Sequence, residues 1–220
     1  MAAWSYSKVN TFKQCPKKYY HLNVKKDVVD KGNAATRYGN ELHKAAEKYI
    51  RDRTPLAAAH EFMQRNLDAL SKIKGEKHCE LKLGVNKDSD EYTPGKFYAK
   101  DVWYRGIADL LIINKKKAYL VDYKSSKSTR YADTKQLDLL AGAVFVNFPQ
   151  VEVVKSALLF VVCDGFITKD HTSDMYKSYL NVFDEELERI EVAHDEGVWN
   201  PIDGPLCGFC PVTSCEHNRR

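Results

Sequence analysis

Two strand-like stretches joined by a short turn constrain the fold of this chain more than any other feature of its sequence. Residues 105–113 and 118–123 are dominated by apolar side chains, and Asn114, Lys115 and Lys116 separate them. Runs of this length and composition around a polar turn predict a β-hairpin. A hairpin alone is only marginally stable in water, so we expect further strands and a covering layer of helices.

Apolar spacing predicts the remaining elements. Helical periodicity covers residues 5–19, with Pro16 opening a second helical turn, and also residues 34–53, 54–73, 132–148 and 176–194. Strand patterns cover residues 79–85, 97–104 and 151–163, the last being a continuous apolar run typical of a strand buried on both faces. The order of these elements predicts an α/β fold with a small mixed central sheet flanked by helices. No linker or repeat divides the chain, so we expect a single domain over residues 1–220.

Composition excludes several classes of protein. Of the 220 residues, 44% are hydrophobic and 11% are aromatic, which is too many for a disordered chain. The longest apolar run, residues 157–163, is too short to span a membrane, and the N-terminus lacks a secretory signal pattern. We therefore expect a cytoplasmic protein without membrane contact. The net charge of +4 is too small to indicate a nucleic-acid partner by itself.

Two aspartates interrupt the apolar stretches of the hairpin. Asp109 and Asp122 each lie inside a strand-like run, where a carboxylate is costly unless something compensates its charge. Carboxylates on successive strands can converge on one point and hold a hard divalent cation, which prefers oxygen ligands. Lys124 lies two residues after Asp122 and therefore on the same face of the strand. It could orient a metal-bound water there, although an exposed Asp–Lys pair is the commoner meaning of such a triplet.

Five short motifs follow one another along the chain. They are Ser5-x-Ser7 with Phe12 and Cys15-Pro16, Gly39 to His43, Gly106 to Asp109, Asp122-Tyr123-Lys124, and Gln136 at the start of a predicted helix. Together they resemble the PD-(D/E)XK nuclease superfamily and, within it, the RecB-like exonuclease branch. Leu140 stands where the helix motif of that branch has Tyr. The resemblance implies a restriction-endonuclease-like core and hydrolysis of phosphodiester bonds in DNA.

The resemblance also implies roles for individual residues. The implied ligands of one or two Mg²⁺ or Mn²⁺ ions are His43, Asp109, Asp122 and the backbone carbonyl of Tyr123. The implied catalytic residues are Lys124, Asp122, Asp109 and Gln136, with Lys124 orienting the attacking water. From the residues alone, His43 could also be a core or surface residue of an amphipathic helix. Glu80, on a predicted strand, is a further acidic candidate.

Three of the six cysteines lie close together near the C-terminus. Cys207, Cys210 and Cys215 form a C-x₂-C-x₄-C pattern, which in a reducing compartment indicates a metal or cluster site. His217 could complete a structural zinc site with them. Alternatively, Cys15 could supply a fourth thiolate, and four thiolates suit an iron–sulfur cluster. We interpret the other two, Cys79 and Cys163, as small buried hydrophobic residues because they lie in apolar runs.

The resemblance favours the cluster over zinc. In the AddB-type and CRISPR-adaptation nucleases of the superfamily, one cysteine near the N-terminus and three near the C-terminus bind a [4Fe-4S] cluster. This implies a [4Fe-4S] cluster on Cys15, Cys207, Cys210 and Cys215. Residues 1–33 and 197–220 would then form a cysteine-ligated clasp that joins the two ends of the chain.

Basic and aromatic residues near these motifs are candidates for contact with DNA. They are Lys17, Lys18, Tyr20, Lys127 and Arg130. We therefore expect an exonuclease acting in DNA replication, recombination or repair. No Walker A sequence is present, so a helicase or recombination partner would be a separate chain. The alternative function is that of a non-catalytic nucleic-acid-binding or scaffold protein on a nuclease fold with a structural zinc tail.

Overall fold

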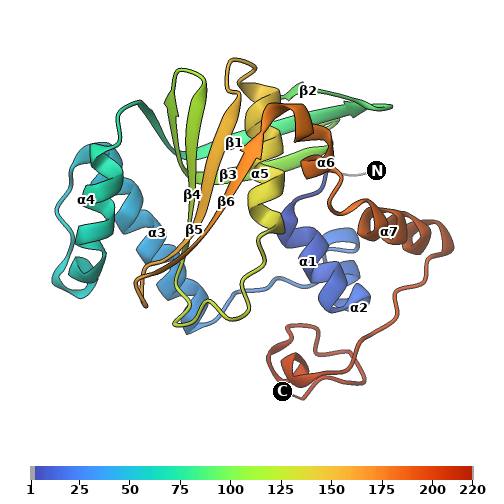
Figure 1. Ribbon diagram of the computed structural model, residues 1–220. Coiled ribbons are helices and arrows are strands. Elements are labelled where there is room, and N and C mark those ends of the chain that lie inside the picture. Colours follow the sequence, from blue (N-terminus) through green and yellow to red (C-terminus); the bar gives the residue numbers. More distant parts are fainter. Residues whose placement is uncertain (1–2, 220) are drawn as a thin grey trace. The chain divides into compact units, whose positions relative to one another are not determined.

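A six-stranded mixed β-sheet forms the centre of the fold. The computed structural model describes residues 3–219 of the chain (Figure 1). The strands lie in the order β2-β1-β3-β4-β5-β6. Their bounds are β1 Glu76–Asp88, β2 Glu91–Gly95, β3 Tyr104–Asn114, β4 Lys117–Lys124, β5 Val153–Phe160 and β6 Gly165–Thr172.

The predicted hairpin is confirmed and consists of β3 and β4. The two strands pair antiparallel from Leu110↔Val121 to Asn114↔Lys117. β4 then pairs in parallel with β5, whereas the other neighbouring strands are antiparallel. A parallel pair needs a crossover connection, and helix α5 (Lys135–Asn147) supplies it.

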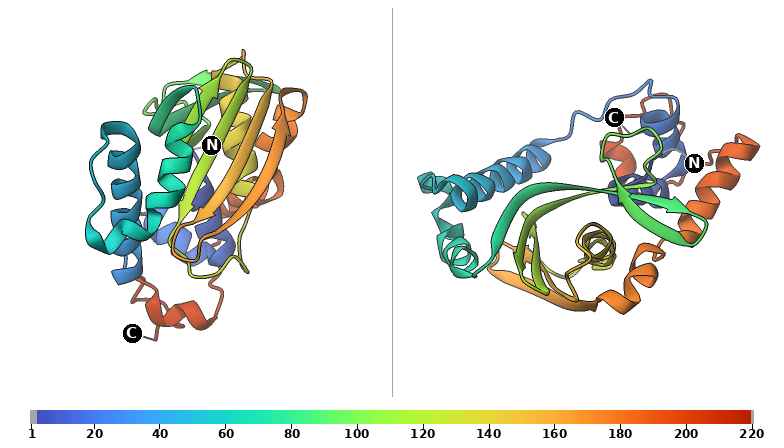
Figure 2. Two further views of the ribbon diagram at one scale, coloured as in Figure 1. Left: turned by 60° about the vertical axis from the view of Figure 1, so that its left-hand side comes forward. Right: turned by 90° about the horizontal axis from the view of Figure 1, so that it is seen from above.

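Helices cover both faces of this sheet (Figure 2). Helices α3 (Ala34–Asp52) and α4 (Gln64–Lys72) lie against one face. There Leu42 and Ile50 of α3 belong to one buried cluster with Leu110 and Val121 of the hairpin. Helix α5 lies on the other face, inside the curve of the sheet, and its residues 137–146 are all buried. The hairpin is therefore held from both sides.

The sequence of α3 defines both of its ends. The Asn33 side chain accepts a hydrogen bond from the Thr36 backbone N–H, and the Thr36 side chain accepts one from the Asn33 backbone N–H, which together form a capping box. The helix ends at Asp52, and the next residue, Arg53, adopts the left-handed conformation common after a last turn. Leu42, Ala46 and Ile50 recur every four residues on the face that packs against the sheet. His43 follows the first of these and so borders the covered face.

One predicted strand is wrong. Residues 96–103 form a loop instead of a strand over residues 97–104, and β2 lies before this loop. The Phe97 and Tyr98 rings pack edge to face, with centroids 5.0 Å apart. The Arg105 side chain donates a hydrogen bond to the Ala99 carbonyl. The apolar pattern thus reflects a packed loop and not a hydrogen-bonded ladder.

Other boundaries also differ from the prediction. The helix expected from Thr54 begins later, with a 3₁₀ turn at Ala58–Met63 before α4. The final predicted helix is divided into α6 (Tyr176–Leu180) and α7 (Asp184–Glu196). The predicted strand over residues 151–163 ends at Phe160, and the chain turns back to form β6. The sequence pattern does not predict β6, because most residues of this edge strand are polar and only partly buried.

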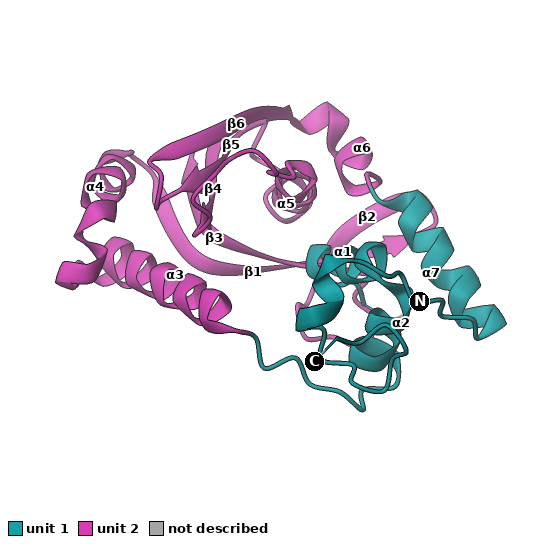
Figure 3. Ribbon diagram, turned by 90° about the horizontal axis from the view of Figure 1, so that it is seen from below, with its two compact units in different colours: residues 1, 3–32, 183–220 teal, residues 2, 33–182 magenta. Residues whose placement is uncertain are grey.

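The described residues form two compact units (Figure 3). Residues 33–182 contain the sheet and helices α3 to α6. Residues 3–32 and 183–219 contain α1 (Tyr6–Gln14), α2 (Pro16–Tyr19), a π-helical turn at Tyr20–Val24, α7 and a 3₁₀ turn at Pro205–Phe209. Pro16 opens α2, as predicted. The single domain over residues 1–220 with a clasp of residues 1–33 and 197–220 stays a prediction.

Aromatic rings hold the second of these units together internally. Trp199 stacks on Tyr19 with ring centroids 5.8 Å apart, and Phe12 meets Tyr19 edge-on at 5.6 Å.

From residue 3 to residue 219, no helix is both long and apolar enough to cross a membrane.

Candidate active site

The two aspartates of the hairpin lie where the pairing of β3 with β4 ends. The last backbone pair on this side is Leu110↔Val121, and Asp109 and Asp122 adjoin it directly. Asp109 Oδ2 accepts a hydrogen bond of 2.7 Å from the Tyr123 backbone N–H. The Asp109 carboxylate thus takes the place of a β3 backbone carbonyl as the acceptor for Tyr123. Both aspartates are buried at the point where the two strands part.

Three potential metal ligands from three elements meet beside this point. His43 of α3, Glu80 of β1 and Asp109 of β3 each place one ligand atom within 4.8 Å of the others. His43 Nδ1 lies 3.3 Å from Asp109 Oδ2. Carboxylate oxygens suit Mg²⁺ and Mn²⁺, and an imidazole nitrogen also binds divalent metals. The chemistry of this donor set therefore fits the predicted divalent cation.

Glu80 joins this group through an unusual backbone conformation. Its φ is 52°, in the left-handed region, which costs a residue with a side chain on the order of 1–3 kcal/mol. The β1–β3 ladder pairs Cys79↔Leu110 and Leu81↔Ala108 but omits the rung of Glu80 and Asp109 between them. Strained residues of this kind cluster at ligand sites. In the sequence, the only signal was an acidic side chain within a predicted strand.

Asp122 belongs to an adjoining set of contacts. Its Oδ1 accepts a hydrogen bond of 2.5 Å from Gln136 Nε2, and its Oδ2 forms an ion pair of 2.6 Å with Lys124 Nζ. Gln136 Oε1 accepts a hydrogen bond of 2.7 Å from Lys124. Gln136 lies in the first turn of α5, so the crossover helix fixes the ammonium group beside the carboxylates. The Lys124 side chain is 31% exposed and remains accessible to a substrate.

Burial and neighbouring charges raise the pKa of three groups of the site, Asp122, Glu80 and His43. Burial and the charge of Asp109 raise the pKa of Asp122 to about 6, against the opposing effect of Lys124. Burial and Asp109 also raise the pKa of Glu80. Burial alone would lower the pKa of His43, but its hydrogen bond to Asp109 and the nearby carboxylates outweigh burial and raise it. Negative charge at this site is therefore incompletely compensated, which favours cation binding.

A scan against protein-family models gives a match to the PD-(D/E)XK nuclease superfamily over residues 3–215. The chain belongs to this superfamily. The mixed sheet between helices is consistent with the predicted restriction-endonuclease-like core.

Two of the matches from a search of solved structures span most of this chain. A candidate exonuclease from Eubacterium rectale has a TM-score of 0.52 and 12% sequence identity, with 98% of this chain and 88% of that chain covered. The crystal structure of SSO0001 has a TM-score of 0.43 and 13% identity, with 99% and 88% covered. A search of curated proteins gives no match.

Within this PD-(D/E)XK nuclease, the other predicted site residues lie in different places. Tyr123 is buried in β4, and its backbone carbonyl stays a predicted ligand. Lys127 and Arg130 are exposed in the segment that follows β4. Lys17, Lys18 and Tyr20 lie in the unit of residues 3–32 and 183–219. Lys17 pairs there with Glu216 and Lys18 with Asp30, so DNA contact by these residues stays a prediction.

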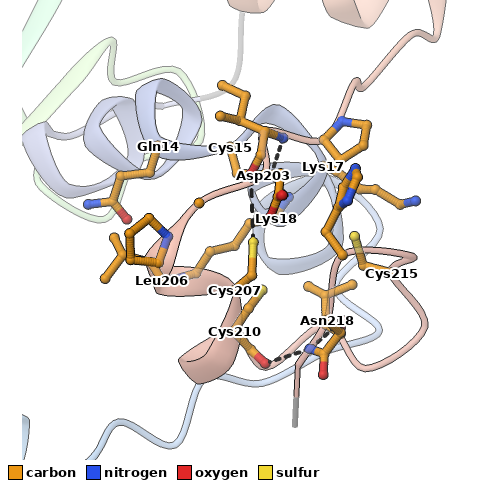
Figure 4. Close-up of a pocket in the computed structure, with 16 residues that line it drawn as sticks. Gln14, Cys15, Lys17, Lys18, Asp203, Leu206, Cys207, Cys210, Cys215 and Asn218 are labelled. Atoms are coloured by element: carbon orange, nitrogen blue, oxygen red, sulfur yellow. Dashed lines mark hydrogen bonds between the residues drawn. The ribbon is translucent and has the colours of Figure 1, made fainter.

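The four cysteines predicted as cluster ligands line one cavity of about 170 Å³ (Figure 4). All four are free thiols. Cys15 Sγ accepts a hydrogen bond of 3.5 Å from the Ile202 N–H, and Cys207 Sγ donates one of 3.8 Å to the Ile202 carbonyl. Within residues 3–219, no three cysteine or histidine ligand atoms lie within 4.8 Å of one another. The cluster and its zinc alternative with His217 both stay predictions.

The interpretation of the remaining cysteines is wrong for Cys163. It is exposed in the turn between β5 and β6, because the predicted strand ends at Phe160. Cys79 is half-buried in β1 against the cluster under α3.

Proposed function

We propose that this chain is a metal-dependent DNA exonuclease. The observation that supports this most is the convergence of His43, Glu80 and Asp109 beside the contacts of Asp122, Lys124 and Gln136. The order of the RecB-like motifs and the description of the Eubacterium rectale relative as a candidate exonuclease motivate the exonuclease assignment. Its substrate would be DNA during replication, recombination or repair in the cytoplasm. Any helicase or recombination partner would be a separate chain.

The residues of the site have distinct roles in the proposed reaction. The proposed ligands of one or two Mg²⁺ or Mn²⁺ ions are His43, Glu80, Asp109, Asp122 and the Tyr123 carbonyl. Such an ion would lower the pKa of a bound water and stabilise charge on the phosphate. Lys124 donates a hydrogen bond to the attacking water or the scissile phosphate. Gln136 keeps the ammonium group in place through its 2.7 Å hydrogen bond.

Cleavage of linear and circular DNA tests this proposal. Purified protein is incubated with single- and double-stranded forms of each DNA in Mn²⁺ or Mg²⁺, and then in EDTA. Metal-dependent loss of linear DNA alone supports an exonuclease. Loss of circles as well changes the assignment to an endonuclease. DNA binding without cleavage favours the non-catalytic scaffold instead.

Two lysines of the same strand provide a matched pair of variants. Lys124→Ala should lower the cleavage rate by about 10²–10³-fold, since that is the typical cost of removing one positioned hydrogen-bond donor from an active site. Lys117→Ala, at the exposed start of β4, should cleave at the parental rate. Circular dichroism of both proteins checks that the fold is unchanged. A Lys124→Ala protein with parental activity contradicts the proposed role of the lysine.

We also propose that Cys15, Cys207, Cys210 and Cys215 hold a [4Fe-4S] cluster. The support is that four free thiols from both ends of the chain line one cavity, and thiolates are the usual ligands of such clusters. Protein purified without oxygen should be brown and contain iron and acid-labile sulfide. Cys15→Ser should remove the colour. A colourless protein with one zinc per chain, unchanged in Cys15→Ser, assigns the site to zinc on Cys207, Cys210, Cys215 and His217.

A further inference from the structure

A basic and aromatic surface lies on the sheet beside the candidate metal ligands. We call it the 82/98 surface, and it consists of Lys82 of β1, Phe97 and Tyr98 of the loop 96–103, and Arg105 and Ile107 of β3. Tyr98 is 73% exposed and Ile107 is 40% exposed. Large exposed aromatic and aliphatic side chains next to a candidate active site indicate a binding surface.

The side chains of this surface are held in place by one another. Lys82 Nζ donates a hydrogen bond of 2.7 Å to the Tyr98 hydroxyl and lies 5.0 Å from the centre of its ring. The Phe97 ring supports Tyr98 edge-on. The Arg105 guanidinium lies 5.9 Å from the centre of the Phe97 ring and holds the loop through the Ala99 carbonyl. The exposed ring of Tyr98 is therefore positioned before any ligand arrives.

The strand register places this surface close to the metal ligands. Lys82 pairs with Ile107, and each lies two residues beyond Glu80 or Asp109 along its strand. Two residues of strand span about 7 Å. Successive nucleotides of one strand in a DNA duplex are about 3.4 Å apart. A strand with the duplex spacing would cover this distance with about two nucleotides, and a more extended single strand with fewer.

The alternation of the strands shows which face the surface occupies. A Cβ on Gly106 would lie 2.8 Å from Leu140 of α5, so Gly106 and its partner Leu83 face α5. Gly106 and Leu110 are four residues apart but face α5 and α3 respectively, so the alternation is interrupted at the missing rung of Glu80 and Asp109. On the Gly106 side of that rung, Ile107 and Lys82, the direct neighbours of Gly106 and Leu83, point to the face opposite α5. Helix α3, which carries His43, covers that same opposite face (Figure 2). The 82/98 surface and His43 therefore share one side of the sheet.

We propose that the 82/98 surface binds the single-stranded DNA end that leads to the metal site. This inference rests on the proposed nuclease function. Tyr98 stacks on a base, and Lys82 and Arg105 contact the phosphates on either side, which is how aromatic and basic side chains hold single strands. Charge favours this occupant over an apolar protein segment. Lys82 lies against the Tyr98 ring. The segment 96–105 adds Lys96, Lys100 and Arg105, against the single acidic residue Asp101.

Binding measurements without cleavage test the inference. Fluorescence anisotropy with a labelled single-stranded oligonucleotide is recorded in EDTA, so that no DNA is consumed. Tyr98→Ala should weaken binding by about tenfold, and Tyr98→Phe, which keeps the stacking ring, should bind as the parent does. Lys82→Gln should reduce the slope of log affinity against log salt by about 0.7, the value for one phosphate contact of a single strand.

Two control variants separate a local effect from a general one. Phe166→Ala removes another exposed ring, 69% exposed on β6, and Lys117→Gln removes another exposed strand lysine. Both should bind and cleave as the parent does. Thermal melting of every variant shows whether it is folded.

The possible results are distinguishable from one another. Parental affinity in Tyr98→Ala, in a protein whose parent cleaves DNA, overturns this inference and leaves the nuclease proposal intact. An equal loss of affinity for single-stranded and duplex DNA overturns the single-strand assignment. A parent protein that neither binds nor cleaves DNA overturns the proposed function and this inference with it.

Discussion

Two sets of buried carboxylates within residues 33–182 have opposite surroundings. Asp122 lies close to Asp109, and burial with that neighbouring charge raises its pKa to about 6. Asp138 of α5 is just as buried. Its Oδ1 lies 2.6 Å from Lys169 Nζ and 2.8 Å from His171 Nε2 of β6. Burial would raise the pKa of Asp138, but the hydrogen bonds from His171 and Lys169 outweigh burial and lower it.

The contrast indicates which of the buried carboxylates is available for chemistry. Both carboxylate oxygens of Asp138 accept hydrogen bonds from Lys169 or His171, so these three residues form a structural hydrogen-bond network. Ser156 lies 3.4 Å from His171 Nδ1, which gives the order of a Ser–His–Asp triad. However, His171 is 0% and Ser156 2% exposed, so no substrate can reach them. The site of Asp109, Asp122 and Glu80 instead keeps uncompensated negative charge next to accessible groups.

Substitution of Asp122 should reduce cleavage strongly while stabilising the fold. Asp122→Asn should lower the cleavage rate by about 10³-fold, because a proposed ligand and the partner of Lys124 are lost. The same change should raise the free energy of unfolding in EDTA at neutral pH, by roughly 2 kcal/mol, because burial and Asp109 disfavour the ionised form of Asp122 in the folded state more than Lys124 favours it. Cleavage assays and urea denaturation measure the two quantities. A destabilised Asp122→Asn protein would mean that the site is compensated like the Asp138 set.

Substitution of Glu80 should affect metal binding and stability in opposite directions. Glu80→Gly should weaken Mn²⁺ binding by at least tenfold, measured by calorimetry, since one carboxylate ligand is removed. It should also stabilise the fold by about 1 kcal/mol, because glycine adopts the left-handed conformation without strain. Glu80→Gln is the control that loses the charge but keeps the strain. Unchanged Mn²⁺ affinity in both variants removes Glu80 from the metal site.

The Asp138 set should respond in the opposite direction. Asp138→Ala should lower the free energy of unfolding by about 2 kcal/mol, because it leaves buried His171 and half-exposed Lys169 without their acceptor. The cleavage rate at 25 °C should change far less than in Asp122→Asn. Lys155→Ala is the control, since it breaks an exposed ion pair with Asp170 that contributes about 0–1 kcal/mol. A Asp138→Ala protein of parental stability would show that the network is not stabilising.

The smallest expected effect is a difference in pH dependence. The folded pKa of Asp138 lies below its unfolded value of about 3.9, so the unfolded chain binds more protons in the interval between them. The stabilising contribution of Asp138 is therefore present above about pH 4 and is lost as the pH falls through the folded value. Asp138→Asn should lose less stability than the parent between about pH 4 and pH 2. Parallel curves of unfolding free energy against pH would contradict the lowered pKa.

Much of the hairpin and its acids could be predicted because the signals are local. Apolar runs and a polar turn identified β3 and β4, and the two-residue spacing put Asp122 and Lys124 on one face. The apolar residues of α5 recur at helical spacing, so this helix could also be predicted, and residues 137–146 are all buried. Each of these features depends on residues that are close together in the sequence.

What could not be predicted depends on distant partners. Glu80 lies beside His43 and Asp109, and its backbone has a left-handed φ. A glutamate in the sequence does not predict that conformation. Asp138 finds His171 and Lys169 more than thirty residues away, on an edge strand whose polar sequence hides it. The loop 96–103 mimics a strand because its rings pack against each other and Arg105.

The end of the β3–β4 ladder links backbone exchange to cation binding. The Tyr123 amide donates to Asp109 Oδ2, an oxygen of one of the proposed metal ligands. A cation bound to the Asp109 carboxylate would withdraw negative charge from it and so weaken the hydrogen bond that it accepts from the Tyr123 amide. The exchange of that single amide hydrogen with solvent therefore reports on occupation of the site, and it does so in the absence of any nucleic acid.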